Sequence, residues 1–171
     1  LETVESVRGV RVIGDDREWV IGDDSVDGSR VIADSPVETI RFPAGLFRQA
    51  NPAINRQLTD HVREAVEQQG GDHVLELFCG AGNLSFALRD TVDQLVGFEQ
   101  TSAAVEMAST LASFVQLEGF RFVEADLSDG YRDWLVGDDL GFDTVVLDPP
   151  RSGASFVCEE LVDADASTIV Y

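Results

Sequence analysis

Two glycines and an acidic residue lie together where a predicted strand ends. The segment runs Glu76-Leu77-Phe78-Cys79-Gly80-Ala81-Gly82-Asn83. Closely spaced glycines let the backbone turn tightly and approach a ligand. A dinucleotide fingerprint needs a third Gly or Ala three residues after the second, and that position is Ser85. Glu76 would repel a pyrophosphate but attract an ammonium or a sulfonium. The segment therefore favours S-adenosylmethionine over a dinucleotide.

Acidic residues also end the next three predicted strands. Glu99 ends the second strand, where a carboxylate can accept hydrogen bonds from both hydroxyls of a ribose. Asp126 ends the third strand, where it can meet an adenine amino group, and Asp148 ends the fourth. In open α/β sheets, ligands bind at the carboxyl ends of strands, near the topological switch point. We therefore predict that these three acids line one binding site.

The elements that must position these residues alternate between strand and helix patterns. Predicted strands cover residues 73–77, 94–98, 120–123, 144–147 and 168–171. Predicted helices cover residues 83–89, 102–115 and 155–162, with a helical turn at 131–136. This alternation implies right-handed βαβ units and a parallel sheet. We predict an α/β fold of Rossmann-like type, with a parallel sheet and helices on both faces.

A further helix precedes the first of these strands. Asn51 can cap it, Pro52 suits its first turn, and Gly70 with Gly71 ends it. Its predicted apolar stripe consists of Ile54, Leu58, Val62, Ala65 and Val66. The stripe has the spacing of one face of a helix.

Residues 1–41 have a different pattern, which predicts a small antiparallel β extension. Strand-like runs at 4–12, 19–21, 30–33 and 37–41 alternate with turn signals, one of which is Asp27-Gly28. Because so few strands have little core of their own, they should pack on the α/β part of the chain or on a missing neighbour. We therefore divide the chain into the extension, 1–41, and an α/β core, 42–171.

The composition is strongly acidic. Against 32 Asp and Glu the chain has 12 basic residues, all of them Arg, and the net charge is −20. Taken alone, this argues against nucleic-acid binding, which usually needs a basic face. Saline cytoplasm, however, favours acidic, Lys-poor surfaces because salt screens their repulsion. We interpret the acidity as a halophilic adaptation that says nothing about ligands.

Several classes of protein are disfavoured. No apolar run approaches the ~20 residues needed to span a bilayer, and no signal peptide is visible, so we expect a cytoplasmic protein without membrane contacts. Two cysteines, Cys79 and Cys158, are too few for a disulfide framework or a four-cysteine metal site. The acidic pairs Asp15-Asp16 and Asp138-Asp139 have no third ligand at suitable spacing. We therefore expect no metal.

Four motifs in order resemble the RNA uracil-C5 methyltransferase family. They are Phe47-x-Gln49-x-Asn51, Glu76-x-Phe78-Cys79-Gly80-x-Gly82-Asn83, Gly97-x-Glu99 and Leu147-Asp148-Pro149-Pro150-Arg151-x-Gly153. The first and last are the discriminating ones. The resemblance covers about residues 40–171. It implies a class I methyltransferase core that uses S-adenosylmethionine, in a parent protein that makes 5-methyluridine in tRNA or ribosomal RNA.

The resemblance also implies a set of cofactor-binding residues: Gln49, Phe78, Gly80, Gly82, Asn83, Glu99, Asp126 and Asp148. Gln49 would touch the cofactor from the segment that leads into the fold. Phe78 and Asn83 would flank its methionine part, Glu99 would hold its ribose, and Asp126 would face its adenine edge. Asp148 would line the place where methyl donor and uracil meet. On the substrate side, Arg151 would position the target or the loop.

The family's chemistry needs a cysteine thiolate that adds to uracil C6, so that C5 can attack the methyl group. A carboxylate base then removes the C5 proton. In the family that cysteine follows the fifth strand, so we expect it just after Tyr171, and we expect no catalytic residue within these 171 residues. Cys79 belongs to the glycine motif, and Cys158 is interpreted as a buried, inert thiol. The chain is thus expected to be the cofactor-binding part of an enzyme, truncated at its C-terminus and inactive alone.

Other functions stay open. A class I methyltransferase could act on another RNA atom or on a small molecule, although enzymes that target exocyclic nitrogen prefer an aromatic residue at the place of Arg151. A non-catalytic module that binds S-adenosylmethionine is a further alternative. A NAD-binding domain is the least favoured, because of Ser85 and Glu76.

Overall fold

A computed structural model of the chain describes residues 9–13, 18–22, 25–28, 40–43, 49, 51–128, 130–132, 141–162, 164 and 166–171. The chain divides into two compact units, Leu1–Phe47 and Arg48–Tyr171.

The described strands of the first unit form two antiparallel pairs. Strand β1 (Gly9–Ile13) pairs with β2 (Glu18–Gly22), and β3 (Ser25–Gly28) pairs with β4 (Ile40–Pro43). Asp27 and Gly28, predicted as a turn, lie within β3, so that prediction is wrong. Their pairing with Arg41 and Ile40 overrides the local turn preference. The predicted strand at residues 30–33 lies outside the described residues.

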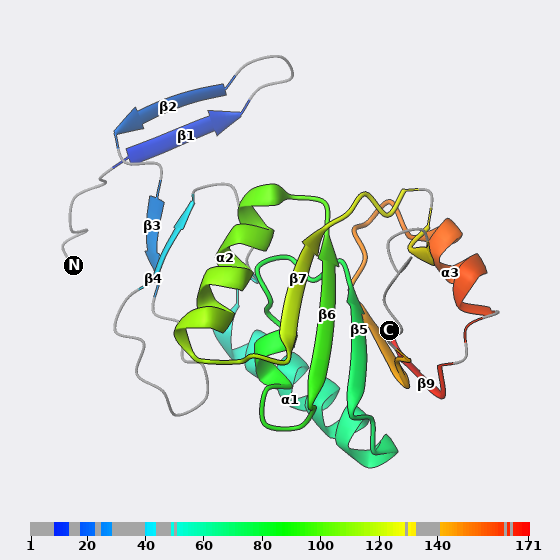
Figure 1. Cartoon of the computed structure of the whole chain (residues 1–171). Coiled ribbons are helices and arrows are strands. Elements are labelled where there is room, and N and C mark those ends of the chain that lie inside the picture. The colour runs from blue at the N-terminus through cyan, green and yellow to red at the C-terminus, as the bar shows by residue number, and fades with distance from the viewer. Residues whose placement is uncertain are drawn as a thin grey trace. The chain divides into compact units, whose positions relative to one another are not determined.

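The second unit contains a five-stranded parallel sheet (Figure 1). Its strands are β5 (His73–Leu77), β6 (Gln94–Glu99), β7 (Phe120–Glu124), β8 (Thr144–Leu147) and β9 (Thr168–Val170). Their order across the sheet is β7-β6-β5-β8-β9. The chain order reverses between β5 and β8, which defines the topological switch point. The predicted Rossmann-like sheet is therefore confirmed.

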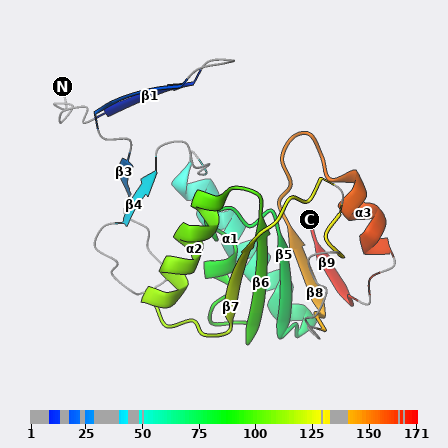
Figure 2. The same cartoon turned by 45° about the horizontal axis from the view of Figure 1, so that its top comes forward.

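Helices cover both faces of this sheet, as predicted. They are α1 (Pro52–Gln69), the 3₁₀ helix η1 (Ser85–Ala87), α2 (Ser102–Phe114) and α3 (Ser155–Val162). Leu75 and Leu77 of β5 join a buried cluster with Val157 of α3. Glu76 points to the opposite face, where it contacts Ser85 of η1. Helix α1 lies behind the sheet in both views (Figure 1 and Figure 2).

The ends of α1 confirm the predicted caps. The Asn51 side chain accepts hydrogen bonds from the backbone N–H groups of Ala53 and Ile54, at 3.0 and 3.2 Å, and Gly70 ends the helix with φ of 66°. These bonds satisfy amide groups that the first helical turn otherwise leaves without partners.

Only part of the apolar stripe of α1 is buried. Val62 and Val66 are buried, but Ile54 is 58% exposed and Leu58 is 36% exposed. The helix has 18 residues, about 27 Å at 1.5 Å per residue. Strand β5 has five residues and is about 17 Å long. The helix is thus longer than the strand, and its exposed apolar residues lie in the half towards its N-terminus.

The predicted helix at residues 83–89 is wrong. Only the 3₁₀ helix η1 forms there, with i→i+3 bonds from Ala87 N to Leu84 O at 2.9 Å and from Leu88 N to Ser85 O at 3.1 Å. Leu84, Ser85, Phe86 and Leu88 are all buried. A segment buried on every side is shaped by its packing, so it lacks the single buried face of a surface helix. Of the predicted turn at 131–136, residues 133–136 lie outside the described residues.

Candidate active site

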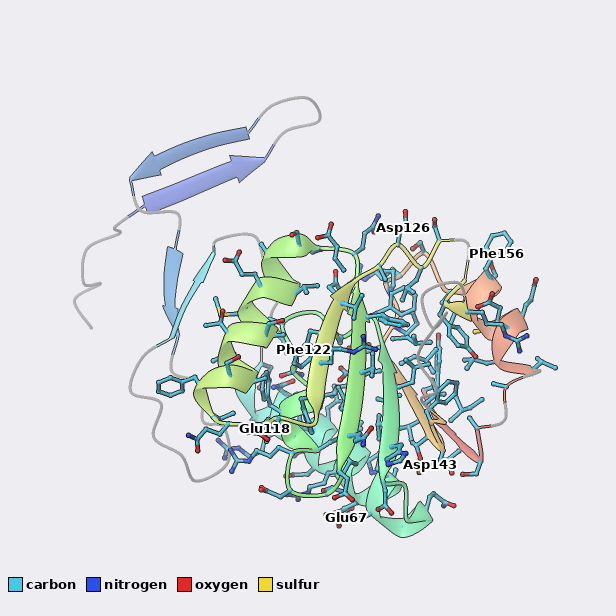
Figure 3. The ribbon with its side chains drawn as sticks, in the orientation of Figure 1. Glu67, Glu118, Phe122, Asp126, Asp143 and Phe156 are labelled. Carbon is cyan, nitrogen blue, oxygen red and sulfur yellow. The ribbon has the colours of Figure 1, made fainter. Side chains whose placement is uncertain are left out.

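The residues predicted to bind a ligand follow strand positions that stand side by side. Leu77 pairs with Phe98 on one side and with Leu147 on the other, so the residues after them, Phe78, Glu99 and Asp148, lie at one edge of the sheet. Asp126 lies two residues beyond Glu124, which pairs with Glu99. Figure 3 shows Asp126 at the carboxyl ends of the strands, while Glu118 and Asp143 lie at the opposite end. The sheet thus brings the predicted acids to one edge.

The loop after β5 has an unusual backbone. Phe78, Gly80 and Gly82 have φ of 64°, 55° and 78°. A Cβ added to Gly82 would lie 2.6 Å from the ring of Phe86, so close packing requires glycine there. A Cβ added to Gly80 would meet nothing within 4 Å, so the backbone of this residue faces open space. A left-handed Phe is uncommon, and such outliers often mark ligand-binding loops.

Glu99 ties this loop to the tip of β6. Its Oε2 accepts a hydrogen bond from Gly80 N at 3.1 Å, and its Oε1 accepts one from Thr101 N at 2.8 Å. A carboxylate offers about four acceptor positions. Each oxygen thus keeps acceptor capacity for a further donor, such as one hydroxyl of a diol.

Glu76, the acid that precedes the glycine loop, is buried. It is 2% exposed, and its Oε2 accepts the hydroxyl of Ser85. The acid is thus covered by its own neighbours, and its predicted attraction for a cationic ligand stays a prediction. Ser85, the residue that breaks the dinucleotide pattern, is the partner of this buried acid.

Asn83 meets a residue that we did not predict. Its Nδ2 donates to Asn55 Oδ1 at 2.8 Å, and Asn55 Nδ2 donates back to Asn83 Oδ1 at 3.0 Å. Asn55 lies on the first turn of α1. The spacing of Asn51 and Asn55, one helical turn apart, is the one signal in the sequence that could have drawn attention to it.

The remaining predicted residues are solvent-accessible. Asp126 is exposed and accepts a hydrogen bond from Ser128 N at 2.9 Å, which lowers the pKa of its carboxyl. Asp148 and Arg151 are exposed at the end of β8. The loop there closes through a bond from Gly153 N to Pro150 O at 2.9 Å. Gln49 is partly exposed, just before α1. The roles of these residues stay predictions.

The two cysteines differ sharply. Cys79 is 4% exposed, and burial raises the pKa of its thiol, with further contributions from Glu76 and Glu99. A thiol that stays protonated is a poor nucleophile. Cys158 is exposed, so its predicted burial is wrong. On α3, Val157 and Leu161 face the core, and Cys158, one position after Val157, points elsewhere.

The described part of the chain contains neither a metal cluster nor a membrane-spanning helix. No group of three or more His, Cys, Asp or Glu side chains there is arranged to hold a metal ion. No helix that the structure describes has the length and apolar character needed to cross a bilayer.

The chain is similar by sequence to RNA methyltransferases. It is 39% identical over 132 residues to the 23S rRNA (uracil(1939)-C(5))-methyltransferase RlmD of Alkalilimnicola ehrlichii, covering 76% of this chain and 29% of that protein. It is 35% identical over 127 residues to RlmD of Haemophilus parainfluenzae, covering 73% and 28%. The chain thus spans about three tenths of the length of the curated relatives it matches.

Solved structures show the same fold. The Pyrococcus abyssi tRNA (uracil-54, C5)-methyltransferase, in complex with S-adenosyl-L-homocysteine, aligns with a TM-score of 0.63 and 24% identity. That alignment covers 90% of this chain and 35% of the other. The putative methyltransferase yhhF of Escherichia coli aligns with a TM-score of 0.57 and 16% identity over 81% of this chain and 75% of the other.

The match to a whole family is more extensive than any of these. Residues 5–171 match the family described as tRNA (Uracil-5-)-methyltransferase. That range includes every residue of the candidate site. The chain therefore belongs to the tRNA (uracil-5-)-methyltransferase family.

Proposed function

We propose that the second unit binds S-adenosylmethionine at the carboxyl edge of β5, β6, β7 and β8. The observation that carries this proposal is the position of Glu99, whose carboxylate holds the Gly80 loop and keeps acceptor capacity beside it. The open space at Gly80 gives a ligand access to the backbone. The S-adenosyl-L-homocysteine bound by the Pyrococcus abyssi enzyme, which has the same fold, supports this choice of ligand.

The residues present fit the parts of that cofactor. When bound, S-adenosylmethionine supplies a methyl group activated by a positively charged sulfur. Glu99 accepts hydrogen bonds from the ribose hydroxyls, and Asp126 accepts one from the adenine amino group. Phe78 and Asn83 flank the amino-acid part, and Gln49 contacts the cofactor from the segment before α1. Asp148 and Arg151 face the side from which a substrate enters.

For the whole protein we propose methyl transfer to C5 of a uridine in tRNA or rRNA. The relatives named as uracil-C5 methyltransferases of 23S rRNA and of tRNA support both substrates. The reaction needs a cysteine that adds to uracil C6. Cys79 does not suit that role, since its buried thiol holds its proton. Cys158, although exposed, lies within α3 and not at the strand ends that form the candidate site. Because the chain spans only about three tenths of the length of its curated relatives, we propose that the nucleophile lies in a part of the protein that these 171 residues do not include.

We further propose that the protein works in a saline cytoplasm. The net charge of −20 and the absence of Lys support this setting, because dissolved salt screens repulsion among carboxylates.

Calorimetric titration with S-adenosyl-L-homocysteine tests the binding site. Glu99→Ala should weaken affinity by about 1–3 kcal/mol, which is roughly 5-fold to 150-fold, because hydrogen-bond partners lose their acceptor. Glu106→Ala, on the exposed face of α2, is the matched control and should bind like the wild type. Unchanged affinity in Glu99→Ala would contradict the site.

Transfer of a labelled methyl group by the full-length protein tests the reaction. Unmethylated tRNA and 23S rRNA, offered separately, distinguish the two substrates. Cofactor binding without transfer to either RNA would favour a non-catalytic binding module instead.

A further inference from the structure

The amide pair between α1 and the glycine loop joins two residues that are 28 positions apart in the sequence. An Asn side chain carries two N–H donors and an oxygen with two lone pairs. The reciprocal bonds, at 3.0 and 2.8 Å, use one donor and one lone pair of each residue. Asn83 therefore keeps one N–H and one lone pair for another partner.

This pairing fixes the orientation of the Asn83 amide. An isolated Asn can exchange its oxygen and nitrogen by turning its amide over, with little change in shape. If Asn83 turned over alone, its N–H would face the N–H of Asn55 and its oxygen would face an oxygen. Both hydrogen bonds would be lost, and two partly buried amides would be left unsatisfied. Asn55 thus determines which way Asn83 presents its donor and its acceptor.

The partner is itself held in place. Asn55 N donates to Asn51 O at 2.9 Å, and the Asn51 side chain caps the same helix. Ile54 and Leu58, on either side of Asn55, are exposed. In this part of α1, where Ile54 and Leu58 are exposed, the amide pair joins the helix to the glycine loop.

We propose that Asn55 is a positioning residue for cofactor binding, acting through Asn83. The remaining N–H of Asn83 suits a carboxylate, and its remaining lone pair suits an ammonium, and the amino-acid part of S-adenosylmethionine carries both groups. The inference rests on the proposed function. It assigns a role in ligand affinity to the first turn of α1, which the reciprocal amide bonds join to the end of the glycine loop.

A double-mutant cycle tests this coupling by calorimetric titration with S-adenosyl-L-homocysteine. Asn55→Ala should weaken affinity about threefold to tenfold, the usual effect of losing one oriented hydrogen bond. In the Asn83→Ala background the same substitution should change nothing further. Asn55→Asp keeps an acceptor for Asn83 Nδ2, so its affinity should lie between those of wild type and Asn55→Ala. Gln57→Ala, exposed on the same helix, is the control.

A second readout needs no ligand. In ¹H–¹⁵N spectra, the side-chain amide signals of Asn83 should shift and exchange faster with solvent in Asn55→Ala, but not in Gln57→Ala. Wild-type affinity in Asn55→Ala, or an equal loss in both backgrounds, would overturn the inference alone. If the wild-type chain binds no S-adenosyl-L-homocysteine, the proposed function fails, and this inference fails with it.

Discussion

At the scale of single residues, the candidate site depends on carboxylates and amides whose partners lie on neighbouring elements. Glu99 reaches Gly80 across the strand tip, and Asn83 reaches Asn55 on α1. Such bonds fix side chains before a ligand arrives, which reduces the entropy lost on binding. The fold itself therefore organises these residues of the site.

The two cysteines should react very differently. Iodoacetamide at pH 8 should modify the native chain once, at Cys158, because this thiol is exposed whereas Cys79 is 4% exposed and holds its proton. Intact-mass spectrometry gives the number of adducts. Cys158→Ser should take none in the native state and one after unfolding in urea. Two adducts on the native wild type would contradict the assigned burial.

Cys79 should also make stability depend on alkaline pH. The pKa of Cys79 in the native chain is raised above the value of about 8.5 in the unfolded chain. Below about pH 8.5 the contribution of this residue to the free energy of unfolding is therefore complete. It is lost as pH rises towards the native pKa, since only the unfolded chain releases the proton. Urea unfolding between pH 7 and 10 should show a steeper loss in wild type than in Cys79→Ala, by at most about 1.4 kcal/mol per pH unit. If the free energy of unfolding falls equally with pH in wild type and in Cys79→Ala, the prediction is wrong.

At the scale of elements, α3 holds the segment after β7 through one residue, Glu160. Glu160 Oε2 accepts bonds from Tyr131 N at 2.5 Å and from Arg132 N at 3.2 Å, and Glu160 O accepts one from Arg132 Nη2 at 2.9 Å. The ring of Tyr131 is buried and meets Phe142 edge-on, 6.3 Å between centroids. The connection that begins at Asp126 is thus anchored to α3.

Gly130 leaves no room for a side chain beside the carboxylate of Glu160. It has φ of 110°, and an added Cβ would collide with the carboxylate of Glu160. Gly130→Ala should destabilise the chain by about 1–3 kcal/mol, through backbone strain and displacement of that carboxylate. Gly141→Ala is the matched control, because a Cβ there meets nothing within 4 Å. Equal urea midpoints for the two variants would count against the anchor.

Element boundaries in the second unit could be predicted because buried strands end at turn residues. Strand β8, Thr144–Leu147, is buried at every position and is followed by Asp148 and two prolines. Which side of a helix is covered could not be predicted in the same way. The exposure of Ile54 and of Cys158 depends on which elements pack against α1 and α3, and periodicity contains no information on that.

The same distinction applies to the candidate site: residues at strand ends could be predicted, and pairings between elements could not. Glu99 and Asp126 could be located from the sequence because acids at strand tips meet at one sheet edge in any parallel fold of this order. The pairing of Asn55 with Asn83 could not, since it depends on how α1 crosses the sheet. The partner of Glu76 was missed for a related reason: local spacing does not show that Ser85 turns inward.

At the scale of the whole molecule, the dominant feature is the excess of negative charge. The chain has 32 acidic residues against 12 Arg, so most carboxylates have no cation of their own. The ion pairs of Arg63 with Asp60 at 3.2 Å and with Glu67 at 3.9 Å are exposed, and exposed pairs add little stability. Mutual repulsion among the excess carboxylates should therefore oppose folding at low salt.

Added salt should stabilise the chain, because the screening length falls from about 10 Å at 0.1 M to about 3 Å at 1 M. We expect the urea midpoint to rise steadily between roughly 0.1 and 2 M KCl. A variant carrying Glu64→Gln, Glu106→Gln, Glu118→Gln and Glu159→Gln, all exposed positions, removes four negative charges and should show a smaller rise. Its midpoint at the lowest salt concentration should exceed that of wild type, since repulsion is lower before any screening. If the variant and the wild type respond equally to KCl, repulsion is not the cause, and the halophilic interpretation of the composition loses its physical basis.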